Sequence, residues 1–166
     1  GLGDVYKRQP IPPSPNLPNM KAVYLYPATC YFEATPVSLG RGTSLPFQVY
    51  GHPNMTGYDY SFTPKSVPGA KNPPQLNKLC HGVNLSNMSD EEIWKRGVDL
   101  SYVIDAYKNL NIGDHFFRPF FELLVGTDYV RKMIIEGKSA EEIKNRWKGD
   151  VEKFKEQRKP YLLYQE

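Results

Sequence analysis

The chain has 166 residues, of which 21 are Lys or Arg and 18 are Asp or Glu, giving a formal net charge of +3. At this length one domain can bury a sizeable core, and 40% hydrophobic with 13% aromatic residues is far from the composition of a disordered segment. No apolar run approaches the roughly 20 residues of a membrane-spanning helix, and the mixed charges form no basic stripe, so we expect neither a membrane span nor nucleic acid as a partner.

The first nine residues are interpreted separately from the rest. Residues 4–9, DVYKRQ, are encoded by DNA that resembles the mosaic-end adapter of transposon-based sequencing libraries. We therefore interpret residues 1–9 as read-through of a non-native adapter and expect the native protein to be longer. The alternative is that these residues are a native linker.

The first half of the chain is rich in proline, because residues 10–74 contain 13 of the 15 prolines. Proline inside a helix removes a hydrogen bond and clashes with the preceding turn, so this half is predicted to consist of short strands and loops. We expect an extended entry over residues 10–18, a helical turn over 29–34 and a glycine-containing loop over 38–44. Residue types and alternation predict strands over residues 20–26, 46–51, 59–63 and 78–85.

After residue 87 the apolar residues recur with helical spacing. Ser89 with Glu92, and Ser139 with Glu142, are spaced as capping boxes, in which hydroxyl and carboxylate each bind a backbone N–H at a helix start. Helices are predicted after Ser89 and over residues 100–111, 120–124, 128–136 and 139–158, with a final strand over 161–164. The fold class is therefore α+β: a small, mostly antiparallel sheet in the proline-rich first half, with helices of the second half packed on it.

The loops of the first half carry the residues best suited to bind a ligand. Gly40 and Gly42 flank Arg41, so the backbone there can adopt left-handed angles and approach a ligand closely. The rigid guanidinium fork suits a carboxylate or a phosphate, which favours an anion or sugar-acid site that also contains Glu33. The alternative is that Arg41 pairs with Glu33 only to hold the loop.

Other chemistries find little support among the residues. His52, His81 and His115 are isolated from one another, and neither cysteine belongs to a CxxC pair, so we expect no metal and no cofactor. His52 follows a predicted strand, as either a ligand-facing residue or a turn histidine bonded to backbone. Cys30 is interpreted as a buried structural thiol rather than a nucleophile, and a disulfide with Cys80 is left open.

Three segments in chain order give the sequence a family resemblance: FEATPVSLGRGT, GHP and GAKNPP. Together with the late segment FFELLVGTDYVRKMIIEGKSAEEI, they resemble the C-terminal part of the NamZ family. The resemblance covers essentially the whole chain from Ile11 onward. Members of this family are bacterial exo-acting β-N-acetylmuramidases. The resemblance implies a glycoside hydrolase that releases N-acetylmuramic acid from the non-reducing ends of peptidoglycan. It also implies that residues 10–166 are the C-terminal domain of a two-domain glycosidase whose Rossmann-like N-terminal domain is absent here.

The resemblance further implies roles for individual residues. Glu33 is the one catalytic candidate in this chain, and the main acid is expected in the N-terminal domain. Arg41 is expected to bind the lactyl carboxylate of muramic acid. The substrate-binding candidates, most of them in the stretch E-x-T-x-x-S-x-G-R-G-T, are Ser38, Arg41, Gly42, Thr43, His52 and Asn72, with Asn77 and Lys78 as secondary candidates.

The implied partners are a peptidoglycan-derived saccharide and the N-terminal domain in cis. The location of this substrate implies an enzyme of the bacterial periplasm or the cell exterior. Because the resemblance implies that the catalytic acid belongs to the N-terminal domain, we predict that the chain alone does not hydrolyse glycosides. An alternative from another class is a noncatalytic carbohydrate-binding or structural module, in which Arg41 and Glu33 are a structural pair.

Overall fold

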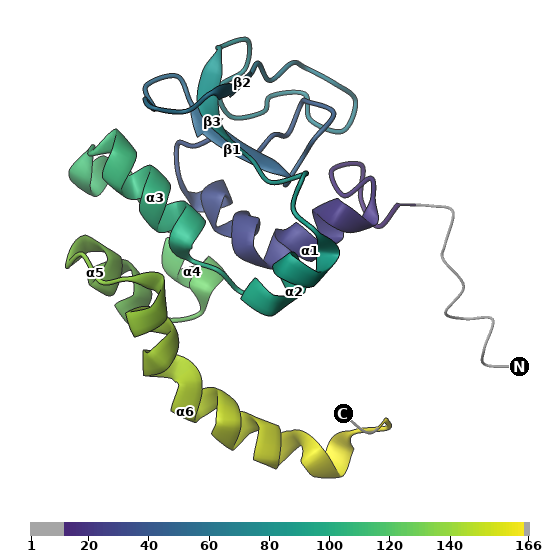
Figure 1. Ribbon diagram of the computed structural model, residues 1–166, viewed down its shortest axis with the longest axis vertical. Helices are drawn as coiled ribbons and strands as arrows, with labels where there is room; N and C mark the ends of the chain where they lie inside the picture. Colours follow the sequence, from purple (N-terminus) through teal and green to yellow (C-terminus); the bar gives the residue numbers. More distant parts are fainter. Residues whose placement is uncertain (1–11, 165–166) are drawn as a thin grey trace, which may run out of the picture.

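The computed structural model describes residues 12–164, so the predictions for residues 1–9, and for the start of the 10–18 segment, lie outside the described residues. Figure 1 shows a small sheet with long loops at the top and helices below it. Helix α1 (Met20–Thr29) and the short helix η2 (Cys30–Ala34) precede the sheet in the sequence, and the remaining helices follow it. The predicted α+β class is therefore confirmed, as is the helical turn near residues 29–34.

Three short strands form one antiparallel sheet in the order β1-β3-β2. Strands β1 (Val49–His52), β2 (Tyr60–Phe62) and β3 (Cys80–Asn84) overlap three of the five predicted strands. Gly51 of β1 lies opposite Gly82 of the central strand. A Cβ atom on Gly82 would overlap the carbonyl oxygen of Tyr50, so the strands can approach this closely only without a side chain there.

The predicted strand over residues 20–26 is wrong, because this segment belongs to helix α1. The side chain of Asn19 caps the helix by accepting a hydrogen bond of 2.9 Å from the N–H of Ala22. Pro27 lies inside the helix, where it removes one backbone hydrogen bond, and the α-helix ends at Thr29. Burial of one helix face outweighs the β-forming tendency of the Val and Tyr residues here. The buried residues of that face are Ala22, Leu25, Ala28 and Thr29.

The second half is helical, as predicted. Helix α2 (Asp90–Arg96) begins where Ser89 Oγ accepts a hydrogen bond of 3.1 Å from the N–H of Glu92, and it ends before Gly97. The remaining helices are α3 (Ser101–Leu110), η3 (Gly113–His115), α4 (Phe121–Val125), α5 (Tyr129–Ile135) and α6 (Ala140–Arg158). Helices α2 to α6 share one hydrophobic core with α1, η2 and β1. The largest fully buried side chains of this core are Phe32, Phe116 and Phe121.

Helix α6 starts with the predicted capping box, in which Ser139 Oγ accepts from the N–H of Glu142 at 3.2 Å and the Glu142 carboxylate accepts from the N–H of Ser139 at 2.8 Å. The helix then runs away from the rest of the molecule (Figure 1). The predicted strand over residues 161–164 is wrong: η4 (Lys159–Tyr161) is followed by an irregular tail that lies beside no strand of the described chain. Within residues 12–164, no helix is both long and apolar enough to cross a membrane.

Candidate functional site

One cavity lies beside the segment that the sequence singled out. It has a volume of about 240 Å³, and Glu33 and Arg41 both line it. These two residues carry the only charged side chains among the described residues of its wall. The full lining consists of Ser14, Asn16, Leu17, Tyr26, Glu33, Arg41 and Phe47.

Glu33 is half-buried in η2, directly after the fully buried Phe32. The ring of Phe32 stacks on Tyr50 of β1 with 4.8 Å between ring centroids, so the core fixes the position from which η2 presents Glu33. Burial and then the negative charge of Glu33 raise the pKa of the Cys30 thiol to about 11. Cys30 is therefore a neutral thiol at neutral pH and a poor nucleophile, and both Cys30 and Cys80 are free.

Arg41 stands between two glycines whose backbone φ angles are both 81°. At Gly42 a Cβ atom would overlap the carbonyl oxygen of Lys65, and the Gly42 carbonyl accepts a hydrogen bond of 2.9 Å from the Lys65 N–H. The backbone on the C-terminal side of the arginine is therefore held in place by the segment that follows β2. Only glycine permits this conformation and this contact at residue 42.

The guanidinium of Arg41 is incompletely satisfied within the described residues. Its Nε atom is buried and has no hydrogen-bond partner there. Among residues 12–164 no ion pair joins Arg41 to Glu33, although both line the cavity. Buried donors in native proteins are almost always hydrogen-bonded, and a guanidinium that lines a cavity without an ion-pair partner among the described residues is suited to an anionic ligand.

Ser38 and Thr43 shape the loop that carries Arg41 and do not line the cavity. Ser38 is fully buried, and its backbone exchanges hydrogen bonds of 2.8 and 2.9 Å with Gly51. The Thr43 hydroxyl donates a hydrogen bond of 2.7 Å to the carbonyl of Gly40 and accepts one of 3.0 Å from the N–H of Leu45. These contacts fix the turn through which Arg41 reaches the cavity.

The structure does not bring His52 or Asn72 to the cavity. His52 ends β1, and its Nδ1 atom accepts a hydrogen bond of 3.1 Å from the N–H of Asn54, the arrangement of a turn histidine. Asn72, like the secondary candidates Asn77 and Lys78, is an exposed loop residue. Within residues 12–164, no three His, Cys, Asp or Glu side chains gather where they could hold a metal ion.

Two aromatic residues of the cavity wall were not predicted from the sequence. The rings of Tyr26 and Phe47 lie 5.0 Å apart and are tilted by 50°. Phe47 has a φ of 60°, which is uncommon for a residue other than glycine, and its N–H donates a hydrogen bond of 2.8 Å to the carbonyl of Leu39. Tyr26 reaches the cavity because residues 20–29 are helical. The incorrect prediction of a strand over residues 20–26 is the reason that Tyr26 is not predicted as a wall residue.

A turn over residues 14–17 contributes the rest of the wall. The N–H of Leu17 donates a hydrogen bond of 2.9 Å to the carbonyl of Ser14, and the side-chain amide of Asn16 donates one of 2.9 Å to the carbonyl of Gly69. This part of the chain is therefore a turn, held against the loop that follows β2, and not the extended entry predicted for residues 10–18.

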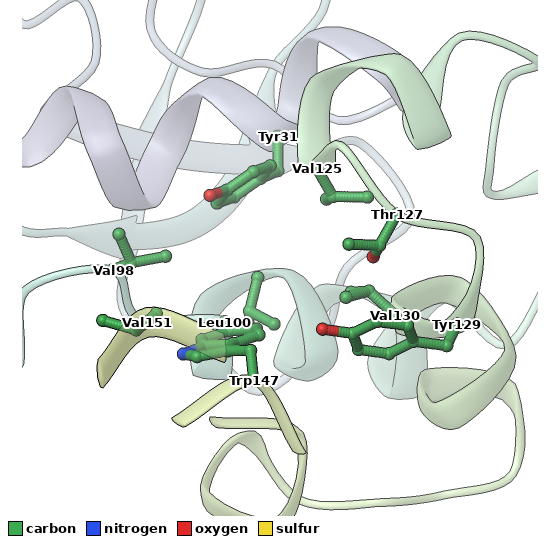
Figure 2. Close-up of a pocket in the computed structure, with 9 residues that line it drawn as sticks. All are labelled: Tyr31, Val98, Leu100, Val125, Thr127, Tyr129, Val130, Trp147 and Val151. Atoms are coloured by element: carbon green, nitrogen blue, oxygen red, sulfur yellow. The ribbon is translucent and has the colours of Figure 1, made fainter. Parts of the chain in front are cut away.

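A second cavity, of about 290 Å³, lies among η2, the α4–α5 connection and α6 (Figure 2). Its wall is mainly aliphatic and aromatic, with Tyr31 on one side and Trp147 and Val151 of α6 on the other (Figure 2). Burial is the main cause that raises the pKa of the Tyr31 hydroxyl to about 12, so this group is neutral at neutral pH. This cavity offers an apolar surface and no charged group among its described residues, so we place the candidate site in the first cavity.

Comparisons with known proteins agree on one family. A family model described as "Exo-beta-N-acetylmuramidase NamZ, C-terminal" matches residues 24–164. The peptidoglycan β-N-acetylmuramidase NamZ of Bacillus subtilis (strain 168) is 34% identical over 167 residues, which cover 92% of this chain and 40% of that protein.

Two solved structures of DUF1343 family proteins from Bacteroides fragilis NCTC 9343 are also similar. One is 82% identical with a TM-score of 0.94 and is matched over 96% of this chain and 45% of its own. The other is 20% identical with a TM-score of 0.67, covering 95% of this chain and 46% of its own, and supports the fold alone. The chain thus spans less than half the length of each of these three relatives.

Proposed function

Because the chain belongs to the NamZ C-terminal family, as its FEATPVSLGRGT, GHP and GAKNPP segments predicted, we propose that it forms the substrate-lining part of an exo-β-N-acetylmuramidase. Such an enzyme releases N-acetylmuramic acid from the non-reducing ends of peptidoglycan. In this proposal the cavity that contains Arg41 and Glu33 receives the acidic substituent of the terminal sugar.

The observation that carries this proposal is that Arg41 lines the cavity with no ion-pair or hydrogen-bond partner for its side chain among the described residues. N-acetylmuramic acid differs from N-acetylglucosamine by a lactyl ether that ends in a carboxylate. A guanidinium binds a carboxylate through charge-assisted hydrogen bonds, which are stronger than neutral ones. Tyr26 and Phe47 add an apolar wall against which the non-polar part of the substituent can pack.

Glu33 is proposed to assist in positioning the sugar or a catalytic group. It is the only carboxylate among the described residues of the cavity wall, whereas glycoside hydrolysis usually uses two carboxyl groups on either side of the scissile bond. We therefore propose that the main acid comes from a Rossmann-like domain that precedes residues 10–166, and that this chain alone does not hydrolyse glycosides. Because peptidoglycan lies outside the cytoplasm, we further propose a periplasmic or extracellular location.

Binding of N-acetylmuramic acid to the 166-residue chain tests the proposal, with N-acetylglucosamine as the sugar that lacks the carboxylate. We expect calorimetry to show tighter binding of the acidic sugar, and Arg41→Gln to weaken it by about ten- to a hundredfold, the loss expected for a hydrogen bond between charged groups. Arg96→Gln is the matched control, because Arg96 forms surface ion pairs with Glu92 and Asp99 and does not line the cavity.

Two results would contradict the proposed site. If the two sugars bound equally, or if Arg41→Gln and Arg96→Gln had the same effect, Arg41 would not recognise the carboxylate, and a structural role for this segment would be favoured. A chromogenic N-acetylmuramide tests the catalytic part separately. Hydrolysis by the 166-residue chain alone, abolished by Glu33→Gln, would show that no preceding domain is needed.

A further inference from the structure

Helix α6 carries an apolar stripe of which only the beginning is buried. Ile143, Trp147, Val151 and Phe154 recur at spacings of four, four and three residues, which places them on one face of the helix. Ile143 is fully buried and Trp147 is half-buried, but Val151 and Phe154 are 43% and 59% exposed. One continuous face of α6 therefore passes from the core into solvent.

The residues after α6 extend this exposed face. Tyr161 and Leu163 are 83% and 91% exposed. Figure 1 shows this tail at the far end of α6, apart from the sheet and its loops. We define the α6–tail surface as Val151, Phe154, Tyr161 and Leu163. Single exposed apolar residues are normal on a protein surface, but five large ones within residues 151–163, these four and Leu162, are typical of an interaction surface.

One end of the α6–tail surface adjoins a cavity. Val151 also lines the apolar cavity of Figure 2, together with Val98 and Leu100 of the α2–α3 connection. Val98 is itself 44% exposed. A partner that covers Val151 would therefore contact both α6 and the α2–α3 connection, and would bury apolar side chains from two separate parts of the sequence.

The lengths of the relatives point to the occupant. The B. subtilis protein and the 82%-identical B. fragilis protein are matched over 40% and 45% of their lengths, so more than half of each polypeptide lies outside the match. Because the family model is described as C-terminal, that remainder precedes the matched part. Two domains joined in one chain commonly share an interface of about 600–1,500 Å².

We propose that the α6–tail surface docks on the polypeptide that precedes this domain in the longer relatives. In this arrangement the apolar stripe of α6 is a core face shared between two domains. The apolar spacing of α6 continues to Phe154 because the preceding domain covers the second half of the stripe. The proposal is independent of which ligand the Arg41 cavity binds.

Hydrogen exchange measured by mass spectrometry tests the proposal. The two samples are the 166-residue chain and a longer chain in which the preceding part of the 82%-identical B. fragilis protein is joined ahead of residue 12. We expect amides within residues 147–163 to exchange at least about tenfold more slowly in the longer chain, because docking suppresses local opening. Amides of α3, which is buried in the domain itself, serve as the internal reference.

Two variants of the longer chain assign the effect to the surface. Phe154→Ser is expected to return the exchange of residues 147–163 toward the rate in the short chain. Leu123→Ser is the matched control, because Leu123 is 84% exposed but lies on α4, outside the α6–tail surface. Equal responses to the two substitutions would overturn the proposal.

Light scattering distinguishes a second copy of this chain as the occupant. We expect the 166-residue chain to be monomeric, and a dimer that slows exchange over residues 147–163 and is lost in Phe154→Ser would overturn the proposal. Equal exchange in the short and long chains would also overturn it. If the joined chain does not fold, the intact B. fragilis protein provides the same comparison over its aligned residues.

Discussion

The hydroxyl of Tyr50 donates a hydrogen bond of 2.8 Å to Oδ2 of Asp105, which joins strand β1 to helix α3. The hydroxyl of Tyr58 donates a second one, of 2.7 Å, to the same oxygen. Because the ring of Tyr50 also stacks on Phe32, this bond supports η2 and, through it, the position of Glu33. Burial first, and then Asp105, raise the pKa of the Tyr50 hydroxyl, so it is a donor at physiological pH.

We expect Asp105→Ala to lower the free energy of unfolding by about 2–4 kcal/mol, because it leaves two phenol hydroxyls without their acceptor. Tyr50→Phe is expected to cost only about 1 kcal/mol, because Asp105 keeps its bond to Tyr58. Urea unfolding followed by circular dichroism measures both values. A cost for Asp105→Ala that does not exceed the cost for Tyr50→Phe would show that the shared acceptor adds nothing to stability.

Gly42 and Gly57 provide a matched pair for the loop that carries Arg41, since both have a φ of 81°. A Cβ atom at Gly57 would meet nothing within 4 Å, whereas at Gly42 it would overlap the Lys65 carbonyl. Gly57→Ala should therefore show only the backbone strain of about 1–2 kcal/mol. Gly42→Ala should lose a further 1–3 kcal/mol or so from overpacking, and should also weaken binding of N-acetylmuramic acid by displacing Arg41.

Thermal or urea unfolding of the two alanine variants checks this prediction, with the sugar titration as the second measurement. If Gly42→Ala and Gly57→Ala lost the same stability, the loop could move away from Lys65 at no cost. Unchanged sugar binding in Gly42→Ala would show that the position of Arg41 does not depend on this contact.

The parts of the fold predicted correctly from the sequence are those determined by local signals. The capping box of Ser139 and Glu142 begins α6 as predicted, because both hydrogen bonds form within one turn. Val and Tyr favour strands and Pro27 resembles a stop, so local signals predict a strand over residues 20–26. The helix is favoured because Leu25 and Ala28 are buried in a core that is built largely from later helices. These contacts are with residues distant in the sequence, so local signals do not reveal them.

The sequence predicts the charged residues of the candidate site but not the aromatic residues of its wall. Glu33 and Arg41 stand in one short motif, and both line the cavity. The same motif did not reveal that Ser38 and Thr43 serve the loop, because a hydroxyl that bonds backbone and one that binds ligand are the same residue type. The position of Phe47 in the cavity wall depends on its positive φ and on its contact with Tyr26 of α1. Neither feature can be recognised in the sequence.

The reactivity of Cys30 provides a probe of Glu33. With a pKa of about 11, roughly one Cys30 thiol in a thousand is ionised at pH 8, so we expect slow alkylation by iodoacetamide in a Cys80→Ser background and faster alkylation in urea. Glu33→Gln should speed the reaction of the folded protein, because it removes the second cause of the raised pKa. Glu91→Gln, an exposed change on α2, is the control. Equal rates for the two variants would place Glu33 too far away to act on the thiol.

His52 should make the protein less stable in mild acid. Burial, and after it the charge of Lys78, lower the pKa of His52 from its ordinary value of 6.5. The unfolded chain therefore binds more protons at this residue below pH 6.5, and the folded state also loses the bond from the Asn54 N–H if Nδ1 is protonated. The contribution is constant above pH 6.5 and diminishes as the pH falls from that value toward the folded-state pKa.

We expect His52→Gln to lose less stability than the parent chain between pH 7 and pH 5.5, as measured by urea unfolding at each pH. Lys78→Gln should raise the pKa of His52, because it removes the second cause of the shift. The ring proton shifts of His52 in NMR spectra report that pKa directly. A His52 that titrated at or above 6.5 in the parent chain would contradict both expectations, since its partial burial at the end of β1 would then not disfavour the charged ring.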